Sequence, residues 1–285
     1  MRGLDITRVG SHDEPNGPTV LISGIGCYVS NCRLRYPWDG IITDGKSNVG
    51  RLNIENVFIV SPRNVGVRVT GTWDVPRLGN IEVWNMGPVP RGLERGVGFL
   101  LGKNDLIRLT DCFVFAMQTG FLLEDKIEGC EIEGGTWGTM ANCATDYCSR
   151  GLVVRGSHTL SVSGGTFWEH HESLLVEGEG ARVRLAGAEL KSNGAPAVVV
   201  RGGDHTVVTG CSILRPMEEY DAPAVLFEGG RLLLSDNVID GFGVGIRIGA
   251  GAQSGLIRGN LIDSHGKPSV DGQAPRVTVD GNVSG

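Results

Sequence analysis

The sequence lacks a long hydrophobic run. No stretch approaches the roughly 18 apolar residues that a membrane-spanning helix needs, and residues 1–10 have no apolar core of the kind found in secretory signal peptides. We therefore expect no membrane partner. The missing signal does not by itself assign a compartment.

An excess of positive charge is also missing. The formal net charge is −6 and no stripe of lysine and arginine is present, which argues against a nucleic-acid partner. Because the overall field repels polyanions, an acidic polymer could be held only by local arginines or by a bound cation.

Metal-binding patterns are scarce. The seven cysteines include no Cys-x2-Cys pair, so we assign no metal site to them; a disulfide between Cys143 and Cys148 stays an open alternative. Neither an Asp-x-Asp-x-Asp loop nor a calcium-binding nonapeptide repeat occurs, although carboxylates at several turns would suit Ca²⁺. The prediction is no certain cofactor, with calcium as the alternative.

What the sequence does contain is a repeat. A frame of an apolar residue, any residue, Gly or an acid, and a small or amide residue recurs at steps of about 22 to 32 residues. Its last position is occupied by Cys32, Asn56, Asn80, Cys112, Thr136, Thr166, Ala188, Cys211, Asn237, Asn260 and Asn282. A period of this length indicates a solenoid.

The residue pattern within each repeat indicates the kind of solenoid. Most frames are preceded by a short apolar or β-branched run bounded by glycine or polar residues, a pattern typical of strands. These runs are Gly40 to Asp44, Gly66 to Thr70, Gly98 to Gly102, Gly120 to Glu124, Gly151 to Arg155, Ser173 to Glu177, Ala197 to Arg201, Ala224 to Glu228 and Gly245 to Gly249. Two or three strands per repeat predict an all-β chain, a parallel β-helix of about ten to eleven turns.

The pattern covers nearly the whole chain and resembles the pectate-lyase-like right-handed β-helix superfamily, which includes polysaccharide lyases, polygalacturonase-type hydrolases, epimerases and phage tailspikes. The resemblance implies a right-handed helix with inward amide ladders at Asn56, Asn80, Asn237, Asn260 and Asn282. It also suggests an extracellular or virion-associated location. No Asn-Thr-Asp, Gly-His-Gly, Arg-Ile-Lys or Trp-Ile-Asp-His motif is present, so the resemblance implies the fold and not the activity.

The ends of the chain suggest partners. Residues 1–18 are polar and rich in turn formers, and we expect them to be a cap or the remnant of a preceding segment, with residues 19–285 forming the β-helix. Because open sheet ends promote association, we expect a homo-oligomer such as a trimer, or an adjoining domain, to cover one end.

Stacking of equivalent positions predicts contacts between turns. The residues that end successive first strands alternate in sign, Glu124, Arg155, Glu177, Arg201 and Glu228, and would lie one strand spacing of about 4.8 Å apart. We interpret this ladder as scaffold.

The least scaffold-like stretch is Trp168-Glu169-His170-His171-Glu172. Counting from the frame position predicts that Glu169 stacks on Lys191, and that His170 stacks on Ser192 and Arg215. We expect a catalytic set of Glu169, His170, His171, Lys191, Arg215 and Asp146, and a substrate-binding set of Trp168, Tyr147, Trp137 and Arg150. The alternative is a solvated turn with a Glu169–Lys191 salt bridge.

Two chemistries fit these residue types. A polysaccharide lyase must neutralise a uronate carboxylate and remove the C5 proton with a base, whereas a glycoside hydrolase needs two carboxyl groups. We therefore expect a carbohydrate-active enzyme of one of these classes, acting on a polysaccharide or oligosaccharide in a groove along the β-helix. The alternative function is a non-catalytic β-helix, either tailspike-like or a carbohydrate-binding or adhesion module.

Overall fold

The chain folds as an all-β parallel solenoid of about 11 turns. The computed structural model describes residues 1–9, 15–85, 95–215, 222–264 and 269–285. They form two compact units, Met1–Ser149 and Arg150–Gly285, which are described separately. No helix among the described residues is long and apolar enough to cross a membrane.

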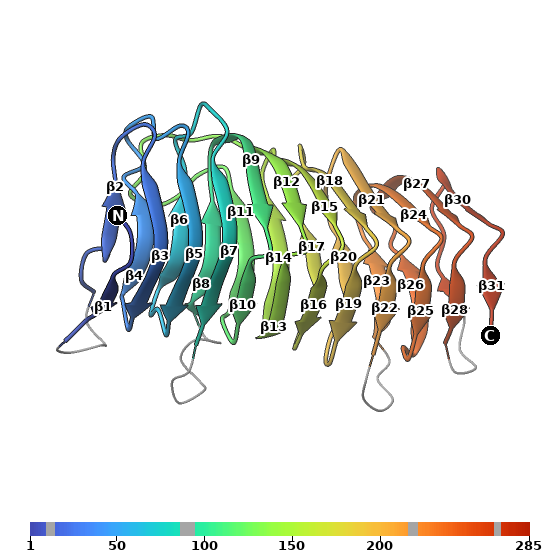
Figure 1. Cartoon of the computed structure of the whole chain (residues 1–285). Coiled ribbons are helices and arrows are strands. Elements are labelled where there is room, and N and C mark those ends of the chain that lie inside the picture. The colour runs from blue at the N-terminus through green and yellow to red at the C-terminus, as the bar shows by residue number, and fades with distance from the viewer. Residues whose placement is uncertain (10–14, 86–94, 216–221, 265–268) are drawn as a thin grey trace. The chain divides into compact units, whose positions relative to one another are not determined.

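Each turn contributes one strand to a short sheet and up to two strands to a longer sheet (Figure 1). In unit 1 the short sheet consists of β2 (Val20–Ile22), β4 (Asp39–Thr43), β6 (Val65–Val69), β8 (Val97–Leu101) and β11 (Thr119–Glu124). The longer sheet of unit 1 consists of β1 (Asp5–Thr7), β3 (Tyr28–Arg35), β5 (Asn53–Val60), β7 (Arg77–Trp84), β9 (Asn104–Thr110), β10 (Phe113–Phe115), β12 (Thr136–Ala141) and β13 (Ala144–Cys148).

Unit 2 repeats this plan. Its short sheet consists of β14 (Arg150–Arg155), β17 (Leu174–Val176), β20 (Val198–Val200), β23 (Pro223–Phe227), β26 (Val244–Ile248) and β29 (Val270–Asp271). Its longer sheet consists of β15 (Thr159–Ser163), β16 (Thr166–Glu169), β18 (Arg182–Ala186), β19 (Glu189–Ser192), β21 (His205–Thr209), β22 (Ser212–Leu214), β24 (Gly230–Ser235), β25 (Val238–Asp240), β27 (Ala252–Arg258), β28 (Leu261–Asp263), β30 (Val277–Asp280) and β31 (Val283–Ser284). The predicted first strands are confirmed within one or two residues.

One position in each turn bends the backbone. This position holds a residue in the left-handed region, within β3, β5 and β7 or between the two strands of the later turns, and unit 1 uses polar residues there: Asn31, Asn56, Asn80, Asp111 and Asn142, with φ between 48 and 53°. Unit 2 uses Gly164, Gly187, Gly210, Asp236, Gly259 and Gly281, with φ between 60 and 66°. Glycine and asparagine are the residues that adopt this conformation at least cost.

The amide ladder is confirmed in unit 2 and wrong in unit 1. Asn237 Nδ2 donates to Asn260 Oδ1 at 2.9 Å and Asn260 Nδ2 donates to Asn282 Oδ1 at 2.8 Å, inside the turns. Asn56 and Asn80 instead point outward, because they occupy the left-handed position and the following residues, Val57 and Ile81, enter the core. The frame alone does not separate these two adjacent positions.

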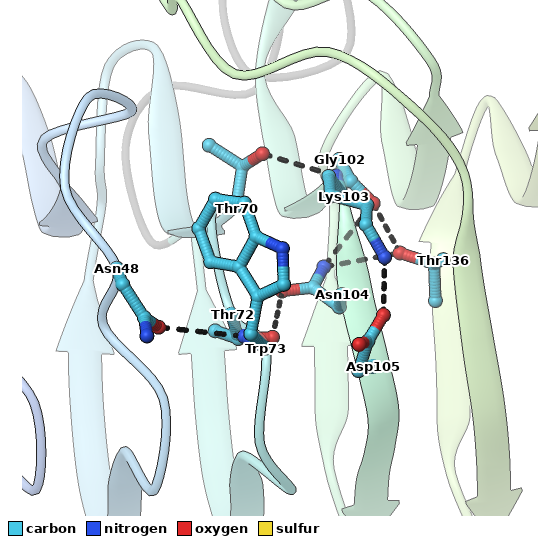
Figure 2. Close-up of polar contacts among 9 residues, drawn as sticks. All are labelled: Asn48, Thr70, Thr72, Trp73, Gly102, Lys103, Asn104, Asp105 and Thr136. Atoms are coloured by element: carbon cyan, nitrogen blue, oxygen red, sulfur yellow. Dashed lines mark hydrogen bonds and ion pairs between the residues drawn. The ribbon is translucent and has the colours of Figure 1, made fainter.

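Unit 1 contains a different buried polar row, which the repeat did not reveal. Asn104 accepts a hydrogen bond from Thr72 Oγ1 at 2.9 Å and donates to Thr136 Oγ1 at 3.0 Å and to Val69 O at 2.9 Å. Figure 2 shows Asn104 between the two threonines. These side chains satisfy backbone groups that the turn removes from the sheet.

The charge ladder is confirmed where it lies within unit 2. Glu177 pairs with Arg155 at 3.0 Å and with Arg201 at 3.2 Å, and Arg201 pairs with Glu228 at 2.9 Å. Alternating charges on adjacent parallel strands therefore bind each turn to the next, as expected for opposite charges one strand spacing apart.

The Cys143–Cys148 disulfide is wrong. Both residues are buried free thiols, and the extended strand β13 separates them by roughly five residues at about 3.3 Å each, beyond the reach of a disulfide. Cys143 instead lies beside Cys112 of the preceding turn, since Phe113 pairs with Ala144.

Candidate functional site

The predicted catalytic stretch lies at the end of β16 in unit 2. Strand alternation sends its side chains to opposite faces: Trp168 is 36% exposed and Glu169 is 1% exposed. His170 is half-buried and His171 is exposed. The five residues therefore do not share one surface.

The predicted stacking of Glu169 on Lys191 is wrong. Trp168 pairs with Lys191, and Glu169 pairs with Ser192. Gly164 and Gly187 are the equivalent left-handed residues, so the frame position in this turn is Gly165 and not Thr166. A slip of one residue moves every side chain to the opposite face.

Trp168, Glu189 and Lys191 form a surface group on β16 and β19, in which Trp168 is exposed and the other two are half-buried. Trp168 Nε1 donates to Glu189 Oε1 at 3.0 Å, and Lys191 Nζ lies 3.9 Å from the centroid of the indole ring. The lysine thus covers one face of the tryptophan in a cation–π contact.

The remaining predicted residues of unit 2 lie in ion pairs or in the interior. Arg150 Nε lies 2.8 Å from Glu172 Oε2. Arg215 is 8% exposed, and its Nη2 donates to Asn193 O at 3.2 Å. Lys191 and Arg215 therefore do not form one exposed cationic site.

Three predicted residues belong to unit 1. Tyr147 is 43% exposed on β13 and stacks on Phe115 with a centroid separation of 6.0 Å. Asp146 precedes it and is half-buried, and Trp137 is 47% exposed on β12. Their combination with residues of unit 2 stays a prediction.

A different cluster in unit 2 combines charge with a hollow surface. Arg182 pairs with His205 across β18 and β21. On the next turn Thr206 pairs with Leu232, so the residues before them, His205 and Arg231, are also equivalent. Arg182, His205 and Arg231 therefore occupy one outward position on three consecutive turns. All three are exposed.

Asp204 holds this row in place. Its carboxylate lies 2.8 Å from Arg182 Nε, 3.2 Å from His205 Nδ1 and 3.6 Å from Arg231 Nη1. The hydrogen bond from Arg182 holds the pKa of Asp204 below its ordinary value, so the carboxylate stays ionised at neutral pH. When His205 is neutral and its Nδ1 carries the proton toward Asp204, Nε2 is left as an acceptor directed elsewhere.

The surface beside this row is concave and partly apolar. Val207, Leu233 and Leu256 are half-buried and follow one another on β21, β24 and β27. A hollow of about 450 Å³ opens over β15, β18 and β21, and another of about 410 Å³ opens over β21, β24 and β27; both are lined by His205 and Val207. Arg184 and Arg276 line their edges. We call Arg182, Arg184, His205, Arg231 and Arg276 with this apolar floor the basic groove.

The sequence signal for the basic groove lies outside the frame and outside the ends of the first strands. Its residues lie at the start of the second strand of each turn, where Arg182, His205 and Arg231 recur at steps of about 23 and 26 residues. Stacking this position as well would have placed three basic or ionisable side chains together.

The fold can be compared with known proteins. The chain is similar to the A-module of the mannuronan C-5 epimerase AlgE6 from Azotobacter vinelandii, with a TM-score of 0.62 and 16% identity over 93% of this chain and 88% of that chain. The chain has the right-handed parallel β-helix fold. No family model and no curated protein matches the sequence, and likeness at this identity extends to the fold alone.

Among the residues that the structure describes, no group of three His, Cys, Asp or Glu side chains is arranged to hold a metal ion. A bound calcium ion stays a prediction.

Proposed function

We propose that the protein is carbohydrate-active and binds a uronate-containing polysaccharide in the basic groove. The observation that carries the proposal is the position of His205, which lies against Asp204 and between Arg182 and Arg231 on adjacent turns. Guanidinium groups bind carboxylates well, and the apolar floor suits the C–H face of a sugar ring.

The proposed reaction begins with removal of the proton at C5 of a uronate. His205 Nε2 takes the proton, and the electron pair of the C5–H bond moves into the carboxylate, whose added charge Arg182 or Arg231 stabilises. In a lyase the electron pair then forms the C4–C5 double bond as the C4–O bond breaks, and the leaving oxygen takes a proton from protonated His205 or from water. In an epimerase water delivers a proton to C5 from the opposite face, and protonated His205 releases its proton to solvent.

A glycoside hydrolase fits the groove less well. That reaction needs two carboxyl groups placed on either side of the scissile bond, and Asp204 is already held by Arg182 and His205. The likeness to a mannuronan C-5 epimerase supports a polysaccharide substrate, and it supports the lyase or epimerase class only through the shared fold.

The test uses a panel of uronate polymers and neutral polysaccharides. Unsaturated products are followed by absorbance at about 235 nm, reducing ends by a colorimetric assay, and epimerisation by NMR of deuterium uptake at C5 in D2O. His205→Ala is expected to abolish turnover, and Arg182→Gln to raise KM. Arg247→Gln, which removes an exposed pair with Asp271 at 3.0 Å outside the groove, is the control.

Two results would overturn the catalytic proposal. The first is the absence of product on every polymer; binding without turnover that Arg182→Gln weakens would instead support the alternative of a carbohydrate-binding module. The second is unchanged activity in His205→Ala together with loss of activity in His171→Ala or Lys191→Ala, which would return the reaction to the stretch around Trp168.

A further inference from the structure

A second concave surface lies on unit 1, outside the basic groove. It is a hollow of about 650 Å³ over β3, β5 and β7, and Asn31, Asn56 and Asn80 line it together with Arg33, Phe58 and Glu82. We infer that this hollow binds a neutral oligosaccharide, a ligand class different from the acidic polymer proposed above.

The three asparagines are not required by the backbone. They occupy the left-handed position of their turns, but unit 2 fills the same position mostly with glycine, for example Gly187 and Gly210. Glycine meets the conformational demand at no steric cost. Three consecutive exposed amides therefore need an explanation other than the turn.

The amides form a row with unused hydrogen-bonding capacity. Asn80 Nδ2 donates to Asn56 Oδ1 at 2.9 Å, and Asn56 Nδ2 donates to Asn31 Oδ1 at 3.1 Å. An amide offers two N–H donors and two acceptor lone pairs, so Asn56 keeps one donor and one acceptor that make no hydrogen bond to the described residues. Repeated pairs of a donor and an acceptor match sugar hydroxyls, which both donate and accept.

An aromatic ring lies beside the amide row. Arg33, Phe58 and Glu82 occupy one register position on β3, β5 and β7, and the Arg33 guanidinium carbon lies 5.4 Å from the centroid of the Phe58 ring. Arg33 lies over one face of this half-buried ring, so a pyranose would contact the part of the ring that Arg33 leaves open, with the arginine and the carboxylate beside it as hydrogen-bonding groups.

The charges of the hollow select a neutral ligand. Asp5 and Glu82 contribute two carboxylates to its lining and Arg33 contributes one cation. Asp5 is already paired with Arg35 at 2.8 Å. With Asp5 paired to Arg35, the remaining charges of Arg33 and Glu82 balance, so the lining has no excess positive charge to attract a polyanion, whereas a neutral sugar needs none.

The experiment titrates the full chain with cellohexaose, mannohexaose and maltohexaose and measures affinity by isothermal titration calorimetry and by chemical-shift changes. At least one sugar is expected to bind. Asn56→Gly and Phe58→Ala are each expected to weaken it by about fivefold or more, the loss of one or two polar or stacking contacts. Asn56→Gly keeps the left-handed backbone, so folding is preserved.

Asn142→Gly is the matched control, because Asn142 is exposed, has φ 51° and does not line the hollow. Failure of all three sugars to bind would overturn the inference, as would equal weakening by Asn56→Gly and Asn142→Gly. Loss of neutral-sugar binding in Arg182→Gln with no effect of Asn56→Gly would assign that binding to the basic groove. Arg182 lies outside the hollow, so Arg182→Gln tests the polyuronate proposal without changing the neutral-sugar site. Either proposal can therefore fail while the other holds.

Discussion

Lys191 lies over the indole ring of Trp168, with Nζ 3.9 Å from the ring centroid, and not beside Glu169. The pairing follows from Gly165, which takes the frame position and moves Thr166 opposite Glu189. It also places the exposed Trp168 and the half-buried Lys191 on the outer face, while Glu169 on the same strand as Trp168 is buried.

A double-mutant cycle tests this register. Trp168→Ala and Lys191→Ala are expected to show a coupling energy of about 0.5 to 1 kcal/mol in urea unfolding, as for an exposed cation–π contact. The Glu169→Gln and Lys191→Ala pair serves as the control and is expected to show coupling near zero. A larger coupling for the second pair would contradict the observed register.

Removal of an interior amide should cost far more than removal of an exterior one. Asn260 accepts from the backbone N and the Nδ2 of Asn237 at 3.1 and 2.9 Å and donates to Leu234 O at 3.1 Å. Asn260→Ala leaves these buried groups without hydrogen-bond partners and is expected to lower the free energy of unfolding by about 3 kcal/mol or more. Asn56→Gly should change it by less than about 1 kcal/mol, because its partners face water.

The free energy of unfolding of both variants is measured by urea unfolding. Equal losses in Asn260→Ala and Asn56→Gly would contradict the assignment of the first amide to the interior and of the second to the surface. Loss of cooperativity in Asn260→Ala alone would agree with it, since the unpaired groups would lie in the interior of unit 2.

Glu177 should make stability depend on acid. Burial raises the pKa of Glu177, but hydrogen bonds and charges from Arg155 and Arg201 outweigh it and hold the pKa below the ordinary 4.5. A lowered carboxyl pKa stabilises the folded state above the unfolded pKa, and this contribution is lost as the pH falls through the folded value. Glu177→Gln should therefore lose about 0.5 to 1 kcal/mol at pH 7, after screening by solvent.

The measurement is the difference in Tm between the two proteins from pH 3 to pH 7, at low and at high salt. The difference in Tm should vanish near pH 3 and should be smaller at high salt than at low salt. A gap that is constant with pH would show that the ion pairs of Glu177 do not contribute.

Asp39 should show the opposite sign. Burial raises the pKa of Asp39 above 3.8, although Asn64 Nδ2 and Val65 N donate to its Oδ1 at 2.8 and 3.2 Å. A raised carboxyl pKa means that the folded state binds the proton more tightly, so this contribution is complete below pH 3.8 and is lost as the pH rises through the folded value. Asp39→Asn keeps an acceptor and carries no charge.

We therefore expect Asp39→Asn to gain stability relative to the parent as the pH rises from 3 to 7, by an amount of about 1 kcal/mol or less. Thermal unfolding across this range, with Asp240→Asn at an exposed strand end as the control, measures the effect. A relative loss of stability with rising pH would show that the hydrogen bonds from Asn64 and Val65 dominate.

The sequence predicted the scaffold because a solenoid repeats one local pattern. The Glu177 and Arg201 pairs followed from the spacing of the repeat, and the Asn237, Asn260 and Asn282 ladder was implied by the resemblance to known β-helices. The orientation of Trp168 and Glu169 did not, since it depends on whether a turn holds one residue more before the strand begins. The Asp204 and His205 pair was invisible for another reason: neither residue lies in the frame or at the end of a first strand.

The left-handed position in each turn, asparagine or aspartate in unit 1 and mostly glycine in unit 2, gives the chain one site per turn whose side chain can change while the backbone does not. The chemistry of the surface can thus change at this position without a change in the fold. A row of amides can be erased or extended one turn at a time, so a recognition surface can be lengthened or shortened in steps of one strand spacing without redesign of the core.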